Sequence, residues 1–314
     1  MREIVGLFVV FVLCLGPACA GAENKESESH TSVGNTAEDL LEAFTNAPDS
    51  LQQFEIASQI AELGDKSTIQ KLEQHLSSQD RATRCNAGLA LARLGEDRGL
   101  TAIIAELRDK SPRPARGEWI RSDGEPDDQG QPRRDRYYAA HVLGVLKDKR
   151  AIPILLEYID DEDVNYALPW TFGQIGDKRA IPALREMLKN AKGDRPVGAA
   201  YGLARLGEPG GWTALFGFLK HADRRFRYRA ADDLGFLGDA RAVTALVEAL
   251  GDEDVSVRRA AIRSLGEIGD PTAIPILEKA RTDKTPVCPP SPLTIADCAD
   301  KAISQINSKA KERK

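Results

Sequence analysis

The amino-acid sequence predicts an all-α solenoid, a superhelix of about seven similar helical hairpins with a capping helix at each end. Three observations predict it: a recurring Gly-acid breakpoint, a constant spacing of apolar residues before it, and a second apolar helix after it. In residues 228–248 the breakpoint is Gly238. Ala230, Leu234 and Leu237 precede it by eight, four and one residues, which places all three on one helical face.

This breakpoint recurs along the whole chain. Its positions are Gly64, Gly95, Gly176, Gly207, Gly238 and Gly269, and Lys147 fills the same slot in one repeat. Most steps are 31 residues long, whereas the step that ends at Lys147 spans 52 residues, one period plus an insertion of 21. A period near 30 residues with two helices in each unit is typical of solenoids, whose hairpins bury their apolar faces against their neighbours.

The first residues predict a signal peptide at 1–20. An apolar run at 4–15 is too short to cross a bilayer comfortably, and Ala18-Cys19-Ala20 forms a cleavage site of small residues. We therefore expect an exported protein, periplasmic or extracellular, with an uncleaved anchor as the alternative. Lipid anchoring at Cys19 is disfavoured because no bulky aliphatic residue stands three positions before it.

The remaining chain divides into three predicted parts. Residues 21–35 are polar and rich in Glu and Ser, which is typical of a disordered tether. Residues 36–308 form the solenoid, which begins with a short capping helix and closes with a helix at 294–306. Residues 309–314 form a basic tail.

An insertion loop at 111–135 interrupts the repeats. It combines Pro, Gly and mixed charge around Trp119. A loop of this length inside a compact array is commonly functional, and insertions into repeats map to one face of a solenoid.

Aromatic residues gather in the middle of the chain. Several of them lie off the main apolar register, so we expect Tyr137, Tyr138, Tyr166, Trp170 and Tyr201 to be exposed in part. Trp, Tyr and Arg are the residues of which interface hot spots are made. The candidate partner-binding set is therefore Trp119, Arg136, Tyr137, Tyr138, Tyr166, Trp170 and Tyr201, and a locally repacked core is the alternative.

Two further features carry expectations. Pro169 stands where most repeats have Ala or Gly in mid-helix, which predicts a kink. Cys288 and Cys298 flank a Pro-rich loop and can form a disulfide in an exported protein, whereas Cys85 is expected to be a small buried residue.

Units such as RRAAIRSLGEIGDPTAIPILEKA resemble the short HEAT repeats of the phycobilisome-lyase-like (E/Z-type, PBS lyase HEAT-like) family over about residues 51–306. The resemblance implies an armadillo-type α-solenoid. It also implies a role for the arginine eleven residues before the breakpoint, which would pair with link acids such as Asp254 and stack hairpin on hairpin. These arginines are Arg84, Arg136, Arg227 and Arg258, and Asn165 and Pro196 depart from the pattern.

No catalytic or metal-binding constellation is present in the sequence. Deoxyhypusine hydroxylase, which resembles this array, uses repeated His-Glu pairs as iron ligands. Here His30, His75, His141 and His221 are followed by Thr, Leu, Val and Ala. The sequence also lacks Gly-x-Ser-x-Gly, His-Glu-x-x-His and a Gly-rich phosphate loop. We therefore expect no catalytic residues, no metal ligands and no cofactor.

These observations favour an exported, non-enzymatic scaffold that binds a protein or peptide partner on its concave surface and insertion loop. A net charge of −5 argues against a nucleic-acid partner. We expect a monomer with no membrane span after signal cleavage. The alternatives are a HEAT-like lyase or hydroxylase-type enzyme or its accessory subunit, and a purely architectural spacer of the cell envelope.

Overall fold

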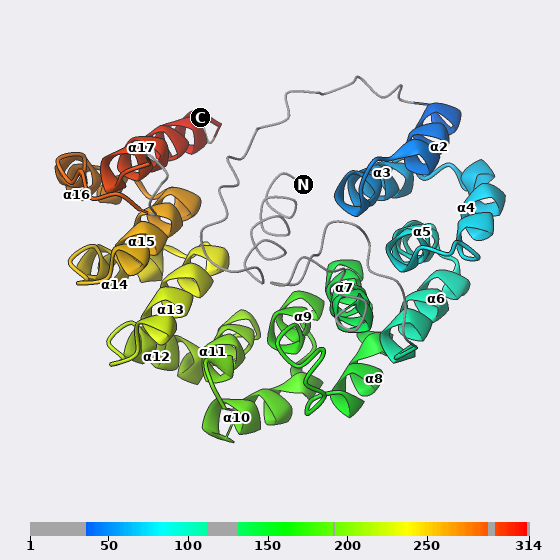
Figure 1. The fold of residues 1–314 in the computed structure, drawn as a ribbon, viewed down its shortest axis with the longest axis horizontal. Helices are drawn as coiled ribbons and strands as arrows, with labels where there is room; N and C mark the ends of the chain where they lie inside the picture. The colour runs from blue at the N-terminus through cyan, green and yellow to red at the C-terminus, as the bar shows by residue number, and fades with distance from the viewer. Residues whose placement is uncertain (1–35, 112–130, 191, 288–292, 313–314) are drawn as a thin grey trace, which may run out of the picture. The chain divides into compact units, whose positions relative to one another are not determined.

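The computed structural model describes residues 36–111, 131–190, 192–287 and 293–312 (Figure 1). These residues form α-helices joined by turns and short 3-10 helices, with no β-strand among them. The predicted all-α class is confirmed. Predictions that concern the signal peptide at 1–20, the tether at 21–35, Trp119 and Cys288 fall outside the described residues.

The helices follow one another in a regular order. Those of the first half are α2 (Ala37–Asn46), α3 (Ser50–Leu63), α4 (Ile69–His75), α5 (Arg81–Arg93), α6 (Asp97–Arg108), α7 (Gln131–Leu146), α8 (Ile152–Glu157) and α9 (Leu168–Ile175). Those of the second half are α10 (Ile181–Asn190), α11 (Arg195–Arg205), α12 (Pro209–Phe218), α13 (Arg224–Leu237), α14 (Val243–Ala249), α15 (Val255–Ile268), α16 (Ile274–Ala280) and α17 (Ile295–Glu312). From α3 to α16 they pair as seven successive hairpins, with α2 and α17 at the ends, as predicted.

One backbone corner recurs between the two helices of the hairpins. At Gly238 the chain turns through the left-handed region, with φ of 65°, which glycine adopts without strain. The side chain of Asp239 then accepts a hydrogen bond from the main-chain N–H of Arg241, which starts the next helical turn. Asp65, Asp148, Asp177 and Asp270 accept the same bond from the residue two positions on.

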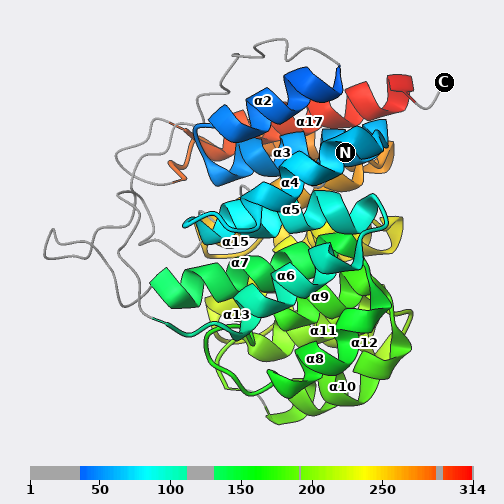
Figure 2. The ribbon, with the colours of Figure 1, turned by 90° about the vertical axis from the view of Figure 1, so that its right-hand side faces the viewer.

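The chain forms two compact units, here called the N-terminal unit (described residues 36–180) and the C-terminal unit (described residues 181–312). In the N-terminal unit α3, α5, α7 and α9 form one layer, and α4, α6 and α8 form the other (Figure 1). Figure 2 shows α3, α5 and α7 as successive steps of the first layer. Phe44, Ile60, Leu72 and Leu91 lie in the core between these helices.

The C-terminal unit repeats the same two-layer arrangement. Helices α11, α13, α15 and α17 form one layer, and α10, α12, α14 and α16 form the other (Figure 1). Leu215, Leu234, Leu246, Leu265 and Ile306 are fully buried between them. Glycines allow neighbouring helices to approach closely: a Cβ added at Gly235 of α13 would clash with Ser264 of α15.

The expected kink at Pro169 is wrong. Residues 162–167 form turns, and α9 begins only at Leu168, so Pro169 lies in its first turn. Proline has no N–H and its ring blocks the preceding carbonyl, so a helix readily starts at proline but does not continue through it. The result is a short first helix rather than a bent one.

Two boundaries also differ from expectation. Helix α7 starts at Gln131, so residues 131–135 of the expected loop are helical. Helix α17 extends to Glu312, beyond the expected end at residue 306 and into the expected basic tail. The extension is held in place because the Lys309 ammonium donates a hydrogen bond to the main-chain oxygen of Glu267.

Candidate functional site

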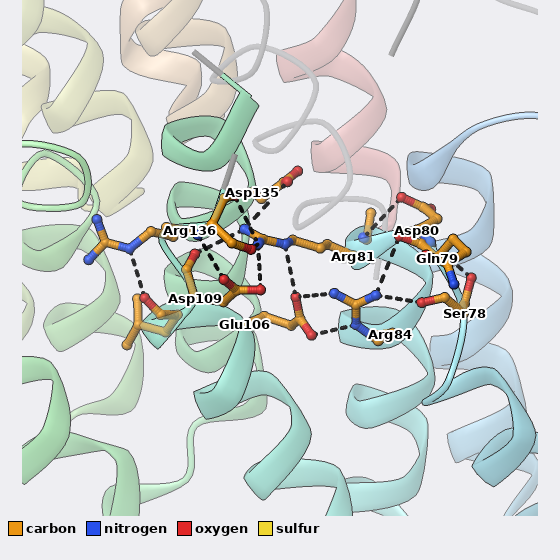
Figure 3. Close-up of polar contacts among 12 residues, drawn as sticks. Ser78, Gln79, Asp80, Arg81, Arg84, Glu106, Asp109, Asp135 and Arg136 are labelled. Atoms are coloured by element: carbon orange, nitrogen blue, oxygen red, sulfur yellow. Dashed lines mark hydrogen bonds and ion pairs between the residues drawn. The ribbon is translucent and has the colours of Figure 1, made fainter. Parts of the chain in front are cut away.

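The two ends of the insertion meet at one buried guanidinium in the N-terminal unit (Figure 3). Arg81, the first residue of α5, is 2% exposed. On the incoming side it lies 2.5 Å from the carboxylate of Asp109 and donates to the Ser111 hydroxyl at 2.9 Å. On the outgoing side it lies 3.8 Å from Asp135 of α7. Residues on both sides of 112–130 are therefore tied to the same side chain.

A second arginine on α5 extends this network. Arg84 donates to both oxygens of Glu106 on α6, with an Nη2–Oε2 distance of 2.7 Å. It also donates to the main-chain oxygen of Ser78, just before α5. The hydrogen bond with Glu106 raises the pKa of Arg84. Glu106 also faces Arg81 at 3.5 Å, so one carboxylate serves two guanidinium groups.

Arg136 of α7 joins two further segments. It has no exposed surface, and its Nε donates to the main-chain oxygen of Leu107 at 2.8 Å. Its other nitrogens bind Asp161 at 2.8 Å and Asp163 at 2.6 Å, both in the link that leads to α9. Lys110 reaches Asp161 as well, at 2.9 Å. Arg136 was predicted as a contact for a partner, but in the structure its guanidinium is fully used inside the unit.

The electrostatics of this network favour permanent charge. The hydrogen bond from Arg136 holds the pKa of Asp161 well below its ordinary value, despite partial burial. Burial disfavours the charged form of Arg136, but Asp161 and Asp163 outweigh it and raise its pKa. A carboxylate that stays ionised and paired does not exchange protons near neutral pH. The network is therefore suited to holding segments together rather than to acid–base chemistry.

The stacking role implied for these arginines is present in other repeats too. Arg227 of α13 binds Asp252 at 2.7 Å and also Glu253, and Arg258 of α15 lies 3.5 Å from Asp283. The expected partner Asp254 instead pairs with Arg224 at 2.9 Å. The acid differs because Asp254 caps the start of α15, where its carboxylate accepts the N–H of Ser256.

Three of the aromatics that we expected to be partly exposed are buried. Tyr137 and Trp170 flank the ring of His141, with centroids 4.7 and 4.6 Å away. Trp170 also packs over Gly144, where an added Cβ would lie 2.8 Å from the indole. Tyr201, on α11 in the other unit, is 2% exposed. Off-register positions are buried here because these helices also pack against a helix of a neighbouring repeat in the same unit, as α7 does with α9 and α11 with α13.

Tyr138 is half-buried and lies in a polar chain through the N-terminal unit. Its hydroxyl donates to the Asn86 carbonyl oxygen at 2.7 Å, and the Asn86 amide donates to Gln53 at 3.2 Å. This chain runs from α7 through α5 to α3. Tyr166 is 37% exposed and is the member of the predicted set that the described residues leave open to solvent.

Of the two cysteine predictions, the burial of Cys85 is confirmed and the disulfide stays a prediction. Cys85 is buried as expected, and burial raises the pKa of its thiol well above the usual value. Cys298 is half-buried on α17, but Cys288 lies outside the described residues, so their pairing stays a prediction.

The sequence reading missed Arg81 and Glu106. Both lie on helices whose apolar register was correct, but a charged residue at the end of a helix is normally solvated. The available signal was the spacing: Arg81 and Arg84 share a face of α5, and Asp109 follows α6 just before the insertion.

The described residues include neither a candidate metal site nor a candidate membrane span. In this part of the chain, no group of three or more His, Cys, Asp or Glu side chains is arranged to hold a metal ion. None of its helices combines the length and apolar character needed to span a bilayer.

Comparison with known proteins gives a family match. A model described as HEAT repeats matches residues 37–122, 129–204 and 212–288, which is well over half of the chain. No curated protein matches this chain.

Solved structures with related folds are distant. The complex of CpcE and CpcF of phycocyanin lyase from Nostoc sp. PCC7120 is 21% identical with a TM-score of 0.46, covering 93% of this chain and 97% of that one. Human deoxyhypusine hydroxylase is 17% identical with a TM-score of 0.35, covering 87% and 96%. The YibA protein of E. coli is 17% identical with a TM-score of 0.42, covering 87% and 92%.

Proposed function

Because the chain belongs to the HEAT-repeat family, we propose that it is an exported, non-enzymatic scaffold that binds a protein or peptide partner. The partner binds the N-terminal unit at the edge where residues 112–130 leave and rejoin the repeats. Repeat arrays of this kind bury their own apolar faces and offer extended surfaces to partners.

The observation that carries this proposal is the clamp made by Arg81. It binds Asp109 and Ser111 on one side of the insertion and faces Asp135 on the other. Fixing the ends of a loop lowers the conformational entropy that the loop loses when a partner binds. The repeats therefore support the insertion, and Trp119, in its middle, is the proposed anchor for the partner.

Because Tyr137 and Trp170 are buried, we remove them from the set of residues proposed to contact the partner. Replacing Trp170 would leave a cavity over Gly144 and would test packing rather than binding. Tyr166, which is 37% exposed, is the second candidate contact.

The test compares capture of the native partner by three variants of the full chain. We expect Trp119→Ala, and replacement of residues 113–129 by a Gly-Ser linker of equal length, to reduce capture at least about tenfold, as loss of a hot spot does. The control is Arg185→Ala, an exposed change on α10 that removes only a pair with Glu208. Capture that is equal for all three variants would contradict the proposal.

A purely architectural spacer is the second candidate, and the burial of Tyr137, Trp170 and Tyr201 favours it. A spacer requires the length of the array but no contact at the insertion. If the protein is a spacer, the variant in which the Gly-Ser linker replaces residues 113–129 should function as well as the wild type in the native host.

Export is proposed from the predicted signal peptide at residues 1–20. The expected result is a mature protein outside the cytoplasm that begins at Gly21 or Glu23, because the small residues Ala20 and Ala22 offer the cleavage sites. Mass spectrometry of the intact protein from its native host checks this. A mass that includes Met1 to Ala20 would contradict it.

A further inference from the structure

Basic residues gather at two successive hairpin corners of the N-terminal unit. The four residues that start at the breakpoint are KDKR in one corner (147–150) and GDKR in the next (176–179). In the same four positions, each of the other five corners has one basic residue or none. The turn itself depends on the aspartate that accepts the main-chain bond, so it does not require the extra lysines and arginines.

The two corners lie side by side. The guanidinium of Arg179 donates to the main-chain oxygen of Lys149 at 2.9 Å and binds Asp177 of its own corner. A side-chain hydrogen bond from Arg179 is the main cause that lowers the pKa of Asp177, and the nearby charge of Lys149 adds to it. Helices α7 and α9, which end at these corners, also pack together (Figure 1). The corners therefore form one surface, here called the basic edge, which consists of Lys147, Lys149, Arg150, Lys178 and Arg179.

The arginines of the basic edge are occupied, whereas its lysines are available. Arg150 pairs with Asp148 and with Asp97 of α6, both at 2.6 Å, and Arg179 pairs with Asp177 at 2.7 Å. The lysines are exposed, and no carboxylate in the described part of the chain forms an ion pair with them. Because the corner aspartates are used by the arginines, three ammonium groups face solvent uncompensated. They are those of Lys147, Lys149 and Lys178.

Lys147 occupies a conformation that disfavours a side chain. Its φ is 59°, in the left-handed region where the other corners have glycine. A Cβ crowds the backbone there, so the lysine costs the fold stability relative to glycine. Its exposed side chain forms no ion pair with the described residues that would offset this cost. A strained residue that the fold does not require indicates a function for its side chain.

We propose that the basic edge binds an acidic segment of a protein partner. Packed neighbouring helices lie about 8–10 Å apart, so the two corners present their ammonium groups at about that spacing. A segment in the polyproline II conformation has three residues per turn and rises about 3.1 Å per residue, so every third side chain lies on one face, about 9 Å from the next. The ligand that fits is an extended segment with Asp or Glu at every third position.

The pattern of charge favours a peptide over a broad anionic surface. Asp97, whose side chain is 82% exposed, stands beside Arg150, and Asp148 and Asp177 lie between the basic residues in the chain. These acids repel a membrane or a nucleic acid that lies flat against the edge. Single carboxylates of a peptide, by contrast, reach the lysines one at a time.

The basic edge is separate from the insertion. Residues 112–130 rejoin the repeats at the start of α7, whereas the first of the two corners follows its end. A helix of 16 residues is about 24 Å long, at 1.5 Å per residue. The inference therefore goes beyond the partner contact proposed for the insertion and does not depend on it.

Titration of the full-length chain with synthetic peptides, followed by NMR, tests the proposal. The probe consists of Glu-Pro-Pro repeats, in which proline enforces the polyproline II conformation, and the matched peptide has glutamine in place of glutamate. At low salt, the amide resonances of residues 147–150 and 176–179 are expected to shift saturably with the glutamate peptide alone. Binding should weaken as salt is added, because exposed charges are screened.

Substitutions of the lysines give the decisive comparison. Lys147→Gly is expected to lower the affinity for the glutamate peptide about threefold and at the same time to raise the melting temperature, because it removes a charge and a strained backbone together. Combining it with Lys149→Gln and Lys178→Gln should lower the affinity at least about tenfold. The control is Lys66→Gln, an exposed lysine at the first corner of the same unit, which should bind as the wild type does.

Three results of the titration would overturn the proposal: no saturable binding, equal affinity of the triple variant and the wild type, or an equal loss of affinity in Lys66→Gln. Vesicles of phosphatidylglycerol and phosphatidylcholine form the second arm. If they sediment the wild type but not the triple variant, the edge binds membranes and the peptide proposal is wrong. Neither arm uses the partner proposed for the insertion, so each proposal can fail without the other.

Discussion

Arg136 shows how a single side chain joins separate segments of the N-terminal unit. It contacts the main chain of α6 and two aspartates that follow α8, with no surface exposed to solvent. Replacing a buried arginine leaves the acids that it neutralised without a partner, and this cost exceeds the value of the pair itself. The resemblance to known repeats predicted its pairing with link acids, whereas nothing in the sequence shows that the side chain is fully enclosed.

The first prediction at this scale concerns Arg136→Met. We expect a loss of about 3 kcal/mol in the free energy of unfolding at pH 7, the lower end for breaking a buried ion pair, because half-buried Asp163 loses its cation and half-buried Asp161 keeps only Lys110. Urea denaturation followed by circular dichroism measures it. The control is Arg150→Met, which removes exposed pairs with Asp97 and Asp148 and should change little. If the two variants lower the free energy of unfolding equally, Arg136 does not hold these segments together as described.

The same substitution changes the response to acid. Because the pKa of Asp161 is lowered in the folded protein, its stabilising contribution is present at neutral pH and is lost as the pH falls below about 4. The unfolding free energy of the wild type should therefore fall more steeply between pH 5 and pH 3 than that of Arg136→Met. If the unfolding free energies of the wild type and of Arg136→Met fall in parallel, the pKa of Asp161 does not depend on Arg136.

At the scale of one element, the hairpin corner explains which helix ends could be predicted from the sequence and which could not. Glycine followed by aspartate marks the corner in most repeats, so the ends of the first helices were predictable. The start of α9 was not, because Pro169 occupies a slot where an apolar register alone suggests a continuous helix. The extension of α17 was not predictable either, since it depends on a contact between Lys309 and α15.

Lys147 provides a test of this corner. It is the non-glycine residue with positive φ among the described residues, at 59°, in the slot that glycine fills elsewhere. Left-handed backbone costs a side-chain-bearing residue about 1 kcal/mol, so Lys147→Gly should raise the free energy of unfolding by about 0.5–1 kcal/mol. Gly238→Lys should lower it by a similar amount. Denaturant titration checks both changes, and effects of the same sign would contradict the explanation.

At the scale of the whole molecule, the number of hairpins and both caps followed from the repeat register, because every repeat is held by its neighbours in the same way. Less of the candidate site could be predicted from the sequence. Residues off the main register were expected to face solvent, yet Tyr137, Trp170 and Tyr201 are buried, since a first-layer helix also packs sideways against adjacent repeats. The insertion was found as a break in the period, whereas the side chains that hold its ends were not.

The capping role of α17 gives a prediction for the full chain. Truncation after Leu293 removes Ala299, Ala302 and Ile306, which are buried, and exposes the face of α15 that they cover. We expect the melting temperature to fall by at least about 5 °C and the protein to self-associate, because an uncapped apolar face is exposed. Truncation after Glu312 keeps α17 whole and serves as the control. An unchanged melting temperature for the shorter chain would show that α17 is no cap.

The meeting of Asp109, Ser111 and Asp135 at Arg81 also bears on how this chain can change over evolution. These contacts lie outside residues 112–130, so insertions, deletions and exchanged segments in that interval leave them in place. Under the proposed function, residues 112–130 can therefore change to suit another partner while the array around them keeps its sequence.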